Sequence, residues 1–306
     1  MFFKKTSGFI CCLVAAIFWG TTFVAQDVAT KTIPPFTFLA LRSFVGAFAL
    51  LLFILWRDAA KKRKGNFEKT DKATWRALLI GGALCGLFLC AASSLQQFGI
   101  GNNAGSPGKD AFITALYIVF VPVLSLFLGK RSAPHVYVSV LVALGGLWLL
   151  CMNGTTLGIG DIQLMGCALI FAGHILVVEI AGARVDAIKL SCVQFFTTGV
   201  LSLVLMLIFE APTLSGILEG WWTVLYAGIL SSAVAFSLQI VGQQRTSATL
   251  ASLVFSLESV VAVIASMVAL SLYPTKTEIL GMLLIFAAIT FSQISLPYKK
   301  RDGQRT

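Results

Sequence analysis

Charged residues are scarce in this chain. They make up 12% of its 306 residues, whereas 58% are hydrophobic and the mean hydropathy is +0.90. A soluble domain keeps about a quarter of its residues charged, so this composition excludes an ordinary soluble globular protein. The formal net charge is +10. The basic residues lie at the ends of hydrophobic blocks, however, and this distribution argues against a nucleic-acid partner.

Motifs for metals, nucleotides and catalysis are also missing. The seven cysteines form no CxxC pair and the chain has only two histidines, so we expect no zinc site. Without a P-loop, direct ATP hydrolysis by this chain is not expected. A membrane-embedded enzyme needs a motif such as HExxH, paired carboxylates or a nucleophile beside a base, and scattered single carboxylates supply none of these. The sequence therefore predicts no enzyme, no metal and no cofactor.

Apolar blocks of about 20 residues, the length that crosses a bilayer as a helix, follow one another along the chain. In lipid the backbone must satisfy its own hydrogen bonds, so blocks this long predict helices. Proline and glycine clusters such as Pro34-Pro35 and Asn153-Gly154 separate the blocks. We predict an all-α integral membrane protein with ten transmembrane helices, at roughly 7–27, 34–56, 75–98, 110–128, 134–152, 161–181, 188–209, 220–242, 247–271 and 276–296.

The distribution of basic residues predicts the orientation. With the N-terminus inside, 19 Lys and Arg fall on the inner side, 3 fall in outer loops and Arg42 lies within the second span, which accounts for all 23. Cytoplasmic loops carry such an excess of positive charge. We therefore expect a multi-pass protein of the cell (inner or plasma) membrane with both termini in the cytoplasm, and lipid as its surroundings.

The two halves of the chain resemble each other. Four residues recur 147 positions later: Trp75, Gly81, Gln96 and Gln97 match Trp222, Gly228, Gln243 and Gln244. Four more recur 153 positions later: Ala15, Ile17, Phe18 and Gly20 match Ala168, Ile170, Phe171 and Gly173. Because each half holds an odd number of spans, the halves must cross the bilayer in opposite orientations. We predict two inverted five-helix repeats, 1–153 and 154–306.

Local motifs within these spans are similar to those of one transporter family. They are Trp19-Gly20-Thr21-Thr22-Phe23 in the first span, Pro34-Pro35-Phe36 and Leu41-Arg42 in the second, Lys109 to Tyr117 with Val121-Pro122 in the fourth, and Phe255-Ser256-Leu257-Glu258 in the ninth. In this order they resemble the EamA-like family of the drug/metabolite transporter superfamily. The resemblance implies export of amino acids or related metabolites, with the proton-motive force as driver.

Two departures from the family pattern affect what the resemblance implies. The family usually has Glu-Pro where this chain has Glu258-Ser259, so we expect the helix break there to be replaced by a mild bend. The Gly-Glu-Arg that often follows the fourth and ninth helices is replaced by Gly129-Lys130-Arg131 and Ser271-Leu272-Tyr273. The acidic residue of that motif therefore has no counterpart here.

Polar side chains inside the spans are the candidates for a binding site, because a charge at the bilayer centre costs about 2.5–3.5 kcal/mol. Glu258 can bind a cationic part of a substrate, carry a proton, or serve as a structural carboxyl. His174 can relay protons or be a neutral ring that donates to a backbone carbonyl. Trp19 and Tyr117 can pack in the core or form an aromatic wall.

Other polar residues have two interpretations as well. Asp110 can stabilise the start of the fourth helix or, with Lys109, form a charged gate. Arg42 is expected to extend outward to the membrane surface. The Gln96-Gln97 and Gln243-Gln244 pairs, at the ends of the third and eighth helices, can line the two mouths of a pathway or simply be solvated there.

We therefore expect a secondary transporter of a small organic metabolite that works by alternating access. Its substrate-binding residues are predicted to be Trp19, Thr22, Tyr117, His174, Gln239 and Glu258. Few charges in the spans favour an apolar or zwitterionic ligand, with protons as a coupling ion. A passive facilitator is the alternative, and a channel is disfavoured because no filter-like segment is present. The substrate and the oligomeric state stay open.

Overall fold

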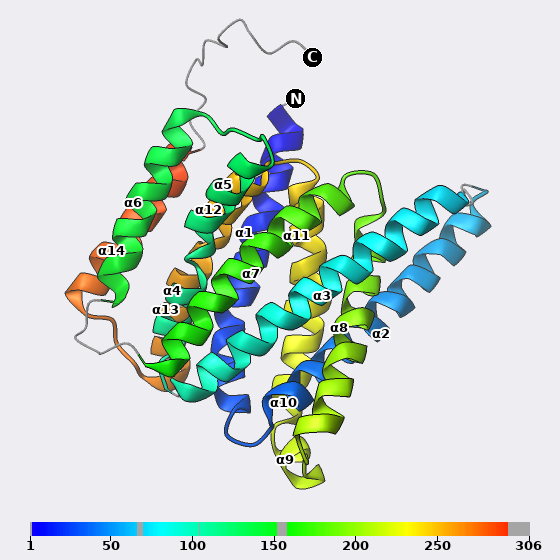
Figure 1. Cartoon of the computed structure of the whole chain (residues 1–306), viewed down its shortest axis with the longest axis horizontal. Helices are drawn as coiled ribbons and strands as arrows, with labels where there is room; N and C mark the ends of the chain where they lie inside the picture. Colours follow the sequence, from blue (N-terminus) through cyan, green and yellow to red (C-terminus); the bar gives the residue numbers. More distant parts are fainter. Residues whose placement is uncertain (1, 66–69, 104, 152–157, 293–306) are drawn as a thin grey trace, which may run out of the picture.

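A computed structural model describes residues 2–65, 70–103, 105–151 and 158–292. These residues form helices and connecting segments without any strand (Figure 1). The helices are α1 (Phe2–Ala29), α2 (Pro35–Arg63), α3 (Lys72–Asn102), α4 (Pro107–Thr114), α5 (Tyr117–Phe127), α6 (Pro134–Cys151), α7 (Ile159–Gly182), α8 (Ala187–Phe209), α9 (Leu214–Glu219), α10 (Trp221–Tyr226), the π-helix η1 (Ala227–Ala235), α11 (Phe236–Gln243), α12 (Ala248–Phe255), α13 (Leu257–Leu270) and α14 (Lys276–Ser292).

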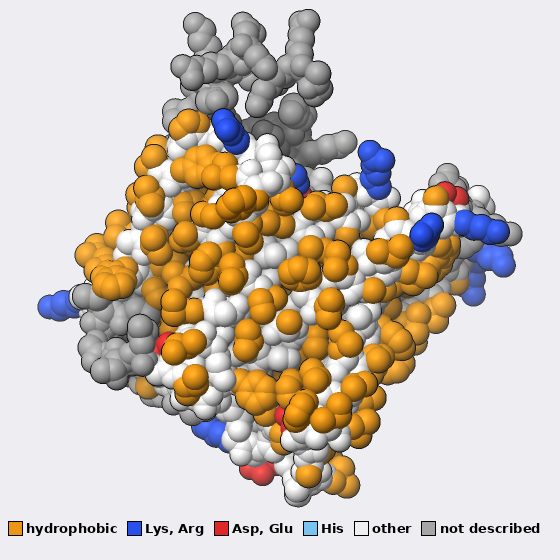
Figure 2. Space-filling model, viewed as in Figure 1, with side chains coloured by type: hydrophobic (Ala, Val, Ile, Leu, Met, Phe, Trp, Pro, Cys, Tyr) orange, Lys and Arg blue, Asp and Glu red, His pale blue; other side chains and the backbone are white. Residues whose placement is uncertain are grey.

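Eight helical segments within the described residues are long and apolar enough to cross a membrane. Their side chains give the middle of the molecule a hydrophobic surface, and Lys and Arg gather toward its ends (Figure 2). The composition therefore predicted the class correctly, because this is a multi-pass helical membrane protein. Two shorter apolar helices, Pro134–Leu149 and Ile279–Ser292, lie in the predicted fifth and tenth spans. Ten crossings in two inverted repeats stay a prediction.

A few sequence-based expectations fall beyond the described ranges. Residue 152 of the predicted fifth span and residues 293–296 of the predicted tenth span lie outside them. So do Lys69 and the four basic residues that follow position 296. The predicted repeat boundary between 153 and 154 lies outside as well.

Helices from the two halves of the chain pack against each other. The helix α3 contacts α7 and α8, α2 contacts α8, α14 contacts α6, and α1 contacts α13 and α11. In Figure 1, α6 and α14 form one edge of the bundle and α2 and α8 the other, with α1 and α7 between them, and α3 runs obliquely from the second edge toward α7. The centre of the bundle is thus built from both halves.

Small residues let these helices approach closely, as the Gly82-x-x-x-Gly86 spacing predicts. A Cβ placed on Gly86 would lie 2.6 Å from the carbonyl oxygen of Gln194 and 2.6 Å from Cβ of Thr197 on α8. The Thr198 hydroxyl also donates to the Gly86 carbonyl oxygen over 3.0 Å. The contact between α3 and α8 therefore depends on the missing side chain.

Two membrane-spanning segments are interrupted. The first breaks at Ala115–Leu116 between α4 and α5, about two turns before Pro122, and the second breaks at Ser256 between α12 and α13. The interruption at Ser256 lies two residues before Glu258-Ser259, where the sequence predicts a mild bend, and the backbone of Ser256 stays in the right-handed helical region.

Serine hydroxyls explain how this break forms without proline. Ser252, Ser256 and Ser259 each donate to the carbonyl oxygen three residues earlier, over 2.9, 2.7 and 2.7 Å. The Ser259 amide also bonds the Ser256 carbonyl oxygen, three residues back instead of four. Such bonds compete with the regular backbone ladder and disturb the helix.

We predict that Gly86→Val lowers the free energy of unfolding in detergent by about 1–3 kcal/mol, because the added side chain overpacks the contact between α3 and α8. The matched control is Gly145→Val on α6, where a Cβ meets no atom within 4 Å. Thermal or denaturant unfolding of both variants provides the measurement. Equal loss of stability in the two variants would show that the close approach at Gly86 is unimportant.

Candidate functional site

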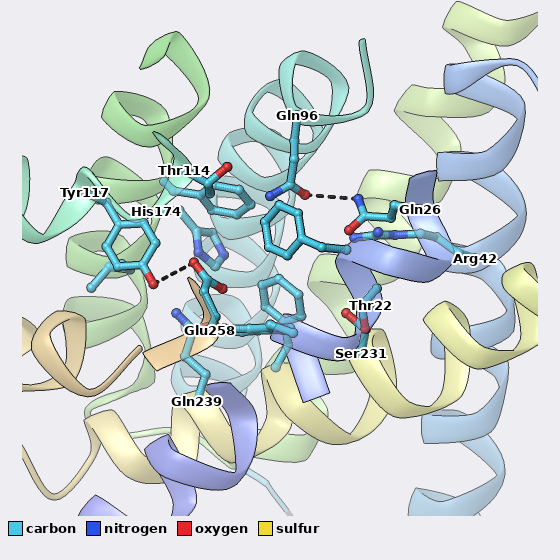
Figure 3. Close-up of a pocket in the computed structure, with 15 residues that line it drawn as sticks. Thr22, Gln26, Arg42, Gln96, Thr114, Tyr117, His174, Ser231, Gln239 and Glu258 are labelled. Atoms are coloured by element: carbon cyan, nitrogen blue, oxygen red, sulfur yellow. Dashed lines mark hydrogen bonds between the residues drawn. The ribbon is translucent and has the colours of Figure 1, made fainter. Parts of the chain in front are cut away.

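A cavity of about 40 Å³ lies at the centre of the bundle (Figure 3). All six residues that the sequence predicts as substrate-binding line it: Trp19, Thr22, Tyr117, His174, Gln239 and Glu258. They come from α1, α5, α7, α11 and α13, so both halves of the chain contribute. A water molecule needs roughly 10–15 Å³ of such space, so the cavity in this conformation has room for a few waters but not for a metabolite.

The two interrupted segments meet at this cavity. Tyr117, the first residue of α5, donates its hydroxyl to Oε1 of Glu258 over 2.8 Å, and both residues are buried. The break at Ser256 places Glu258 in the first turn of α13 and not in mid-helix. The positive end of a helix dipole favours a carboxylate there. The Tyr117 hydroxyl is the one hydrogen-bond donor that the described residues supply to this carboxyl group.

Gly20 allows α1 to approach this point. A Cβ on Gly20 would lie 2.6 Å from the carbonyl oxygen of Glu258 and 2.5 Å from Cβ of Val261. Because α1 lies so close to α13, Trp19 and Thr22, which flank this contact on α1, line the cavity. Trp19 does so as part of an aromatic group, with ring centroids 4.8 Å from Phe236 and 5.1 Å from Phe255. Trp19 therefore both packs in the core and lines the cavity.

His174 is fully buried, but its partner is not the backbone carbonyl that one interpretation expected. Its Nε2 lies 3.3 Å from Oε1 of Gln194 on α8. Because an amide oxygen only accepts hydrogen bonds, Nε2 is the donor. Among the described residues, Nδ1 of His174 and Oε1 of Gln239 have no hydrogen-bond partner. Both atoms are buried, whereas the Thr22 hydroxyl donates to the Phe18 carbonyl oxygen over 2.6 Å.

Sequence reasoning missed several lining residues, including Gln26 on α1. Its amide donates to Oε1 of Gln96 and of Gln97, over 3.1 Å each. The signal was present, because Trp19, Thr22 and Gln26 follow the helical spacing that puts residues on one face. Gln96 also lies deeper than predicted, since α3 continues to Asn102 and the glutamine pair does not end the helix.

Arg42 corrects another expectation. It was predicted to extend outward to the membrane surface, but its side chain is 3% exposed and lines the cavity. The reason is the packing of α2 against η1 and α8, which turns the face that carries Arg42 toward the protein interior.

The π-helix η1 had no signal in the sequence. It spans Ala227–Ala235 and presents Ser231 to the cavity. The matching segment of the first half, 147 positions earlier at 80–88, lies in the regular helix α3. Extra residues of this kind often occur in helices at functional sites. Here they distinguish the second half from the first.

A charged network closes one end of the bundle, where α1 ends. Lys109 forms an ion pair with Asp161 at 2.8 Å, and Asn103 donates to Oδ1 of both Asp110 and Asp161 over 2.9 Å. The amide of Gly105 donates to Oδ1 of Asp27 over 2.7 Å. Lys109, in the first turn of α4, therefore links this helix to α7. No group of three or more His, Cys, Asp or Glu in the described ranges is arranged to hold a metal ion.

The opposite end, where α1 begins, has a vestibule of about 780 Å³. It is lined by Phe9, Lys130, Arg131 and Arg245, among others. Glu179 forms an ion pair with Lys130 and accepts a hydrogen bond from the amide of Ala248, at the start of α12, over 3.0 Å. Gln244, one member of the second glutamine pair, lines this vestibule.

We predict that Tyr117→Phe lowers the free energy of unfolding by about 1–3 kcal/mol, because it leaves a buried carboxyl group without its donor. Combined with Glu258→Leu, which cannot accept the hydrogen bond, in a double-mutant cycle, it should show a coupling of about 1 kcal/mol or more. Tyr226→Phe is the control, since that hydroxyl donates to the hydroxyl of Thr21 over 2.6 Å, away from the carboxyl group. Additive effects of the two cavity substitutions would contradict a direct interaction.

Comparisons with known proteins agree with this architecture. A protein of Bacillus subtilis (strain 168), named Uncharacterized transporter YoaV, is 25% identical over 294 residues, which cover 93% of this chain and 96% of that protein. Protein PagO of Salmonella typhimurium is 25% identical over 271 residues, covering 85% and 84% of the two chains. A solved structure described as "Crystal structure of protein" matches the fold with a TM-score of 0.73 at 20% identity, covering 94% of this chain and 96% of the other.

The family comparison covers nearly the whole chain. The model of the EamA-like transporter family matches residues 6–152 and again residues 158–293. The two matched ranges lie in the first and second halves of the chain, which also resemble each other in sequence. The helical bundle, the central cavity and these matches agree: the chain belongs to the EamA-like transporter family of the drug/metabolite transporter superfamily.

Proposed function

We propose that this protein is a secondary transporter that exports small organic metabolites such as amino acids by alternating access, with protons as the coupling ion. The observation that carries the proposal is the meeting of two interrupted helices, one from each half, at a small central cavity. Transporters commonly place their substrate site at such breaks, because unwound backbone and helix ends offer polar groups in mid-membrane.

Two lysine–carboxylate pairs support alternating access. Lys109 lies in the first turn of the interrupted segment and Lys130 follows its end. Their partners Asp161 and Glu179 lie near the two ends of α7. The α4–α5 segment is therefore tied to α7 at both ends of the bundle. In this conformation both pairs are formed and the central cavity is small. Opening either end for substrate would break the pair at that end.

The repeat arrangement supports the same mechanism. The proposed halves, 1–153 and 154–306, each contain one interrupted segment, and these two segments pack against each other at the centre. Inverted repeats that rock about a central site expose it to the two sides of the membrane in turn.

The environment of Glu258 supports proton coupling. The side chain is 4% exposed, and within the described residues no Lys, Arg or His lies at ion-pair distance from it. An ionised carboxylate in such surroundings is costly, and a proton or a cationic part of the substrate removes that cost. A single carboxyl group that binds either a proton or the substrate can couple proton movement to substrate transport.

The excess of basic residues on one side supports an orientation with both termini in the cytoplasm of a cell membrane. Phe9, near the start of α1, and Ser292, at the end of α14, both line the large vestibule. The vestibule would then face the cytoplasm, which is the side from which an exporter collects its substrate.

We predict that proteoliposomes containing the wild-type protein accumulate a labelled member of an amino-acid and metabolite panel when a pH gradient is imposed. Glu258→Gln should abolish accumulation, because its amide cannot carry the proton. Glu219→Gln, at an exposed position of α9, is the control and should transport normally.

Two outcomes would contradict parts of this proposal. Substrate-specific equilibration that neither the gradient nor Glu258→Gln affects would indicate a passive facilitator and remove the coupling role of Glu258. Absence of flux for every compound in the panel would contradict transport of small metabolites itself.

A further inference from the structure

Arg42 is the feature of the cavity that the proposed transport cycle leaves without a role. Its side chain is 97% buried and lines the cavity, and in Figure 3 it reaches from α2 toward Gln26. It is the one lysine or arginine among the cavity-lining residues that the structure describes. The cavity therefore has a single positive end.

No acidic side chain neutralises this guanidinium. Every ion pair within the described residues involves other groups, so no carboxylate lies within 4.0 Å of Arg42, and its Nε has no hydrogen-bond partner there. The contact that Arg42 does make is with an aromatic ring, since its Cζ lies 5.8 Å from the centroid of Phe38. A cation–π contact of this kind offsets only part of the free energy of burying a charge.

The backbone holds Arg42 in this position. A Cβ on Gly228 of η1 would lie 3.0 Å from the carbonyl oxygen of Arg42, so the π-helix packs directly on this turn of α2. Gln26, whose amide is fixed by Gln96 and Gln97, lies next to the guanidinium in Figure 3. The backbone that carries Arg42 is thus packed on η1, and the neighbouring Gln26 is held by two hydrogen bonds.

The opposite side of the cavity carries an acidic side chain and hydrogen-bonding groups. Tyr117 and Glu258 lie across the close-up from Arg42, and His174 and Gln239 lie beside them (Figure 3). Trp19 and Phe236 add apolar surface to the lining. A ligand that fits this order has an anionic group at one end, an apolar body, and a hydrogen-bonding or cationic group at the other end.

We propose that Arg42 binds the carboxylate of the transported substrate, so that the substrate class is small monocarboxylates with an apolar body, amino acids included. This inference rests on the proposed function and gives it a recognition element. The planar guanidinium matches a carboxylate through two parallel N–H···O bonds. A single buried cation suits a single negative charge, whereas a phosphate group with two charges would leave one unneutralised.

The experiment is a binding measurement that does not require transport. Matched ligands isolate each end of the cavity: L-leucine, 4-methylpentanoate, which lacks the amine, and L-leucinamide, which lacks the carboxylate, with the corresponding series for phenylalanine. Their affinities for the purified protein are measured in detergent for the wild type and for Arg42→Gln. Arg57→Gln is the control, because Arg57 lies on the same helix but pairs with Asp186 at 2.9 Å outside the cavity.

We expect the wild type to bind at least one series through its carboxylate, with the amide weaker by about 10- to 100-fold, the contribution of a charge-assisted hydrogen-bonded pair. Arg42→Gln should lose that preference and Arg57→Gln should keep it. Arg42→Lys retains the charge without the planar fork, so it should fold and give an intermediate affinity.

Equal affinity for acid and amide, an unchanged preference in Arg42→Gln, or no binding of any carboxylate would overturn the assignment. The two proposals fail separately. Carboxylate binding that depends on Arg42, without flux in proteoliposomes, would support the anion site while contradicting transport. Gradient-driven flux of a compound without a carboxylate, unaffected by Arg42→Gln, would do the reverse.

Discussion

The free energy of placing a polar or charged group in a low-dielectric interior governs the arrangement of this protein. Every such group within the membrane needs a partner, a helix end or a cavity. The carboxyl group of Glu258 has the Tyr117 hydroxyl and the first turn of α13. Asp161 has Lys109, and Glu179 has Lys130. Arg42 has an aromatic face and the cavity itself.

This constraint also explains why the polar residues converge. Isolated polar groups facing lipid would each carry the full cost of desolvation, whereas groups that surround one cavity share waters or a ligand. The two interrupted helices meet at the same cavity, where Tyr117 begins α5 and Glu258 lies in the first turn of α13. Burial, helix breaks and the binding site are therefore consequences of one requirement.

Much of the site could be predicted from the sequence for this reason. Tyr117, His174 and Glu258 are polar residues in apolar spans. The free-energy cost of exposing them to lipid was enough to predict that they face the protein interior, and all three line the cavity. The prediction for Arg42 was wrong. The cost of placing a charge in lipid can be avoided in two ways, by extension to the membrane surface or by burial at a cavity. The contact between its turn of α2 and η1 decides between them, and that contact is not visible in the spacing of residues.

The helix breaks show a similar limit. Pro122 follows the first break, but the second depends on the hydroxyls of Ser252, Ser256 and Ser259, and serine within a helix more often bends it mildly. The π-helix was not predictable, since its sequence is an ordinary apolar run with two serines. The helical class and the membrane-spanning segments, in contrast, follow from length and hydrophobicity, which depend little on tertiary contacts.

Access to the cavity tests the central claim most directly. A cysteine in place of Thr22, in an otherwise cysteine-free protein, would sit at the cavity wall with little change in size. A membrane-impermeant maleimide is then applied from either side of sealed vesicles. Alternating access predicts that Thr22→Cys is labelled from both sides and that bound substrate slows the labelling. Labelling from one side only, or from neither, would contradict the account.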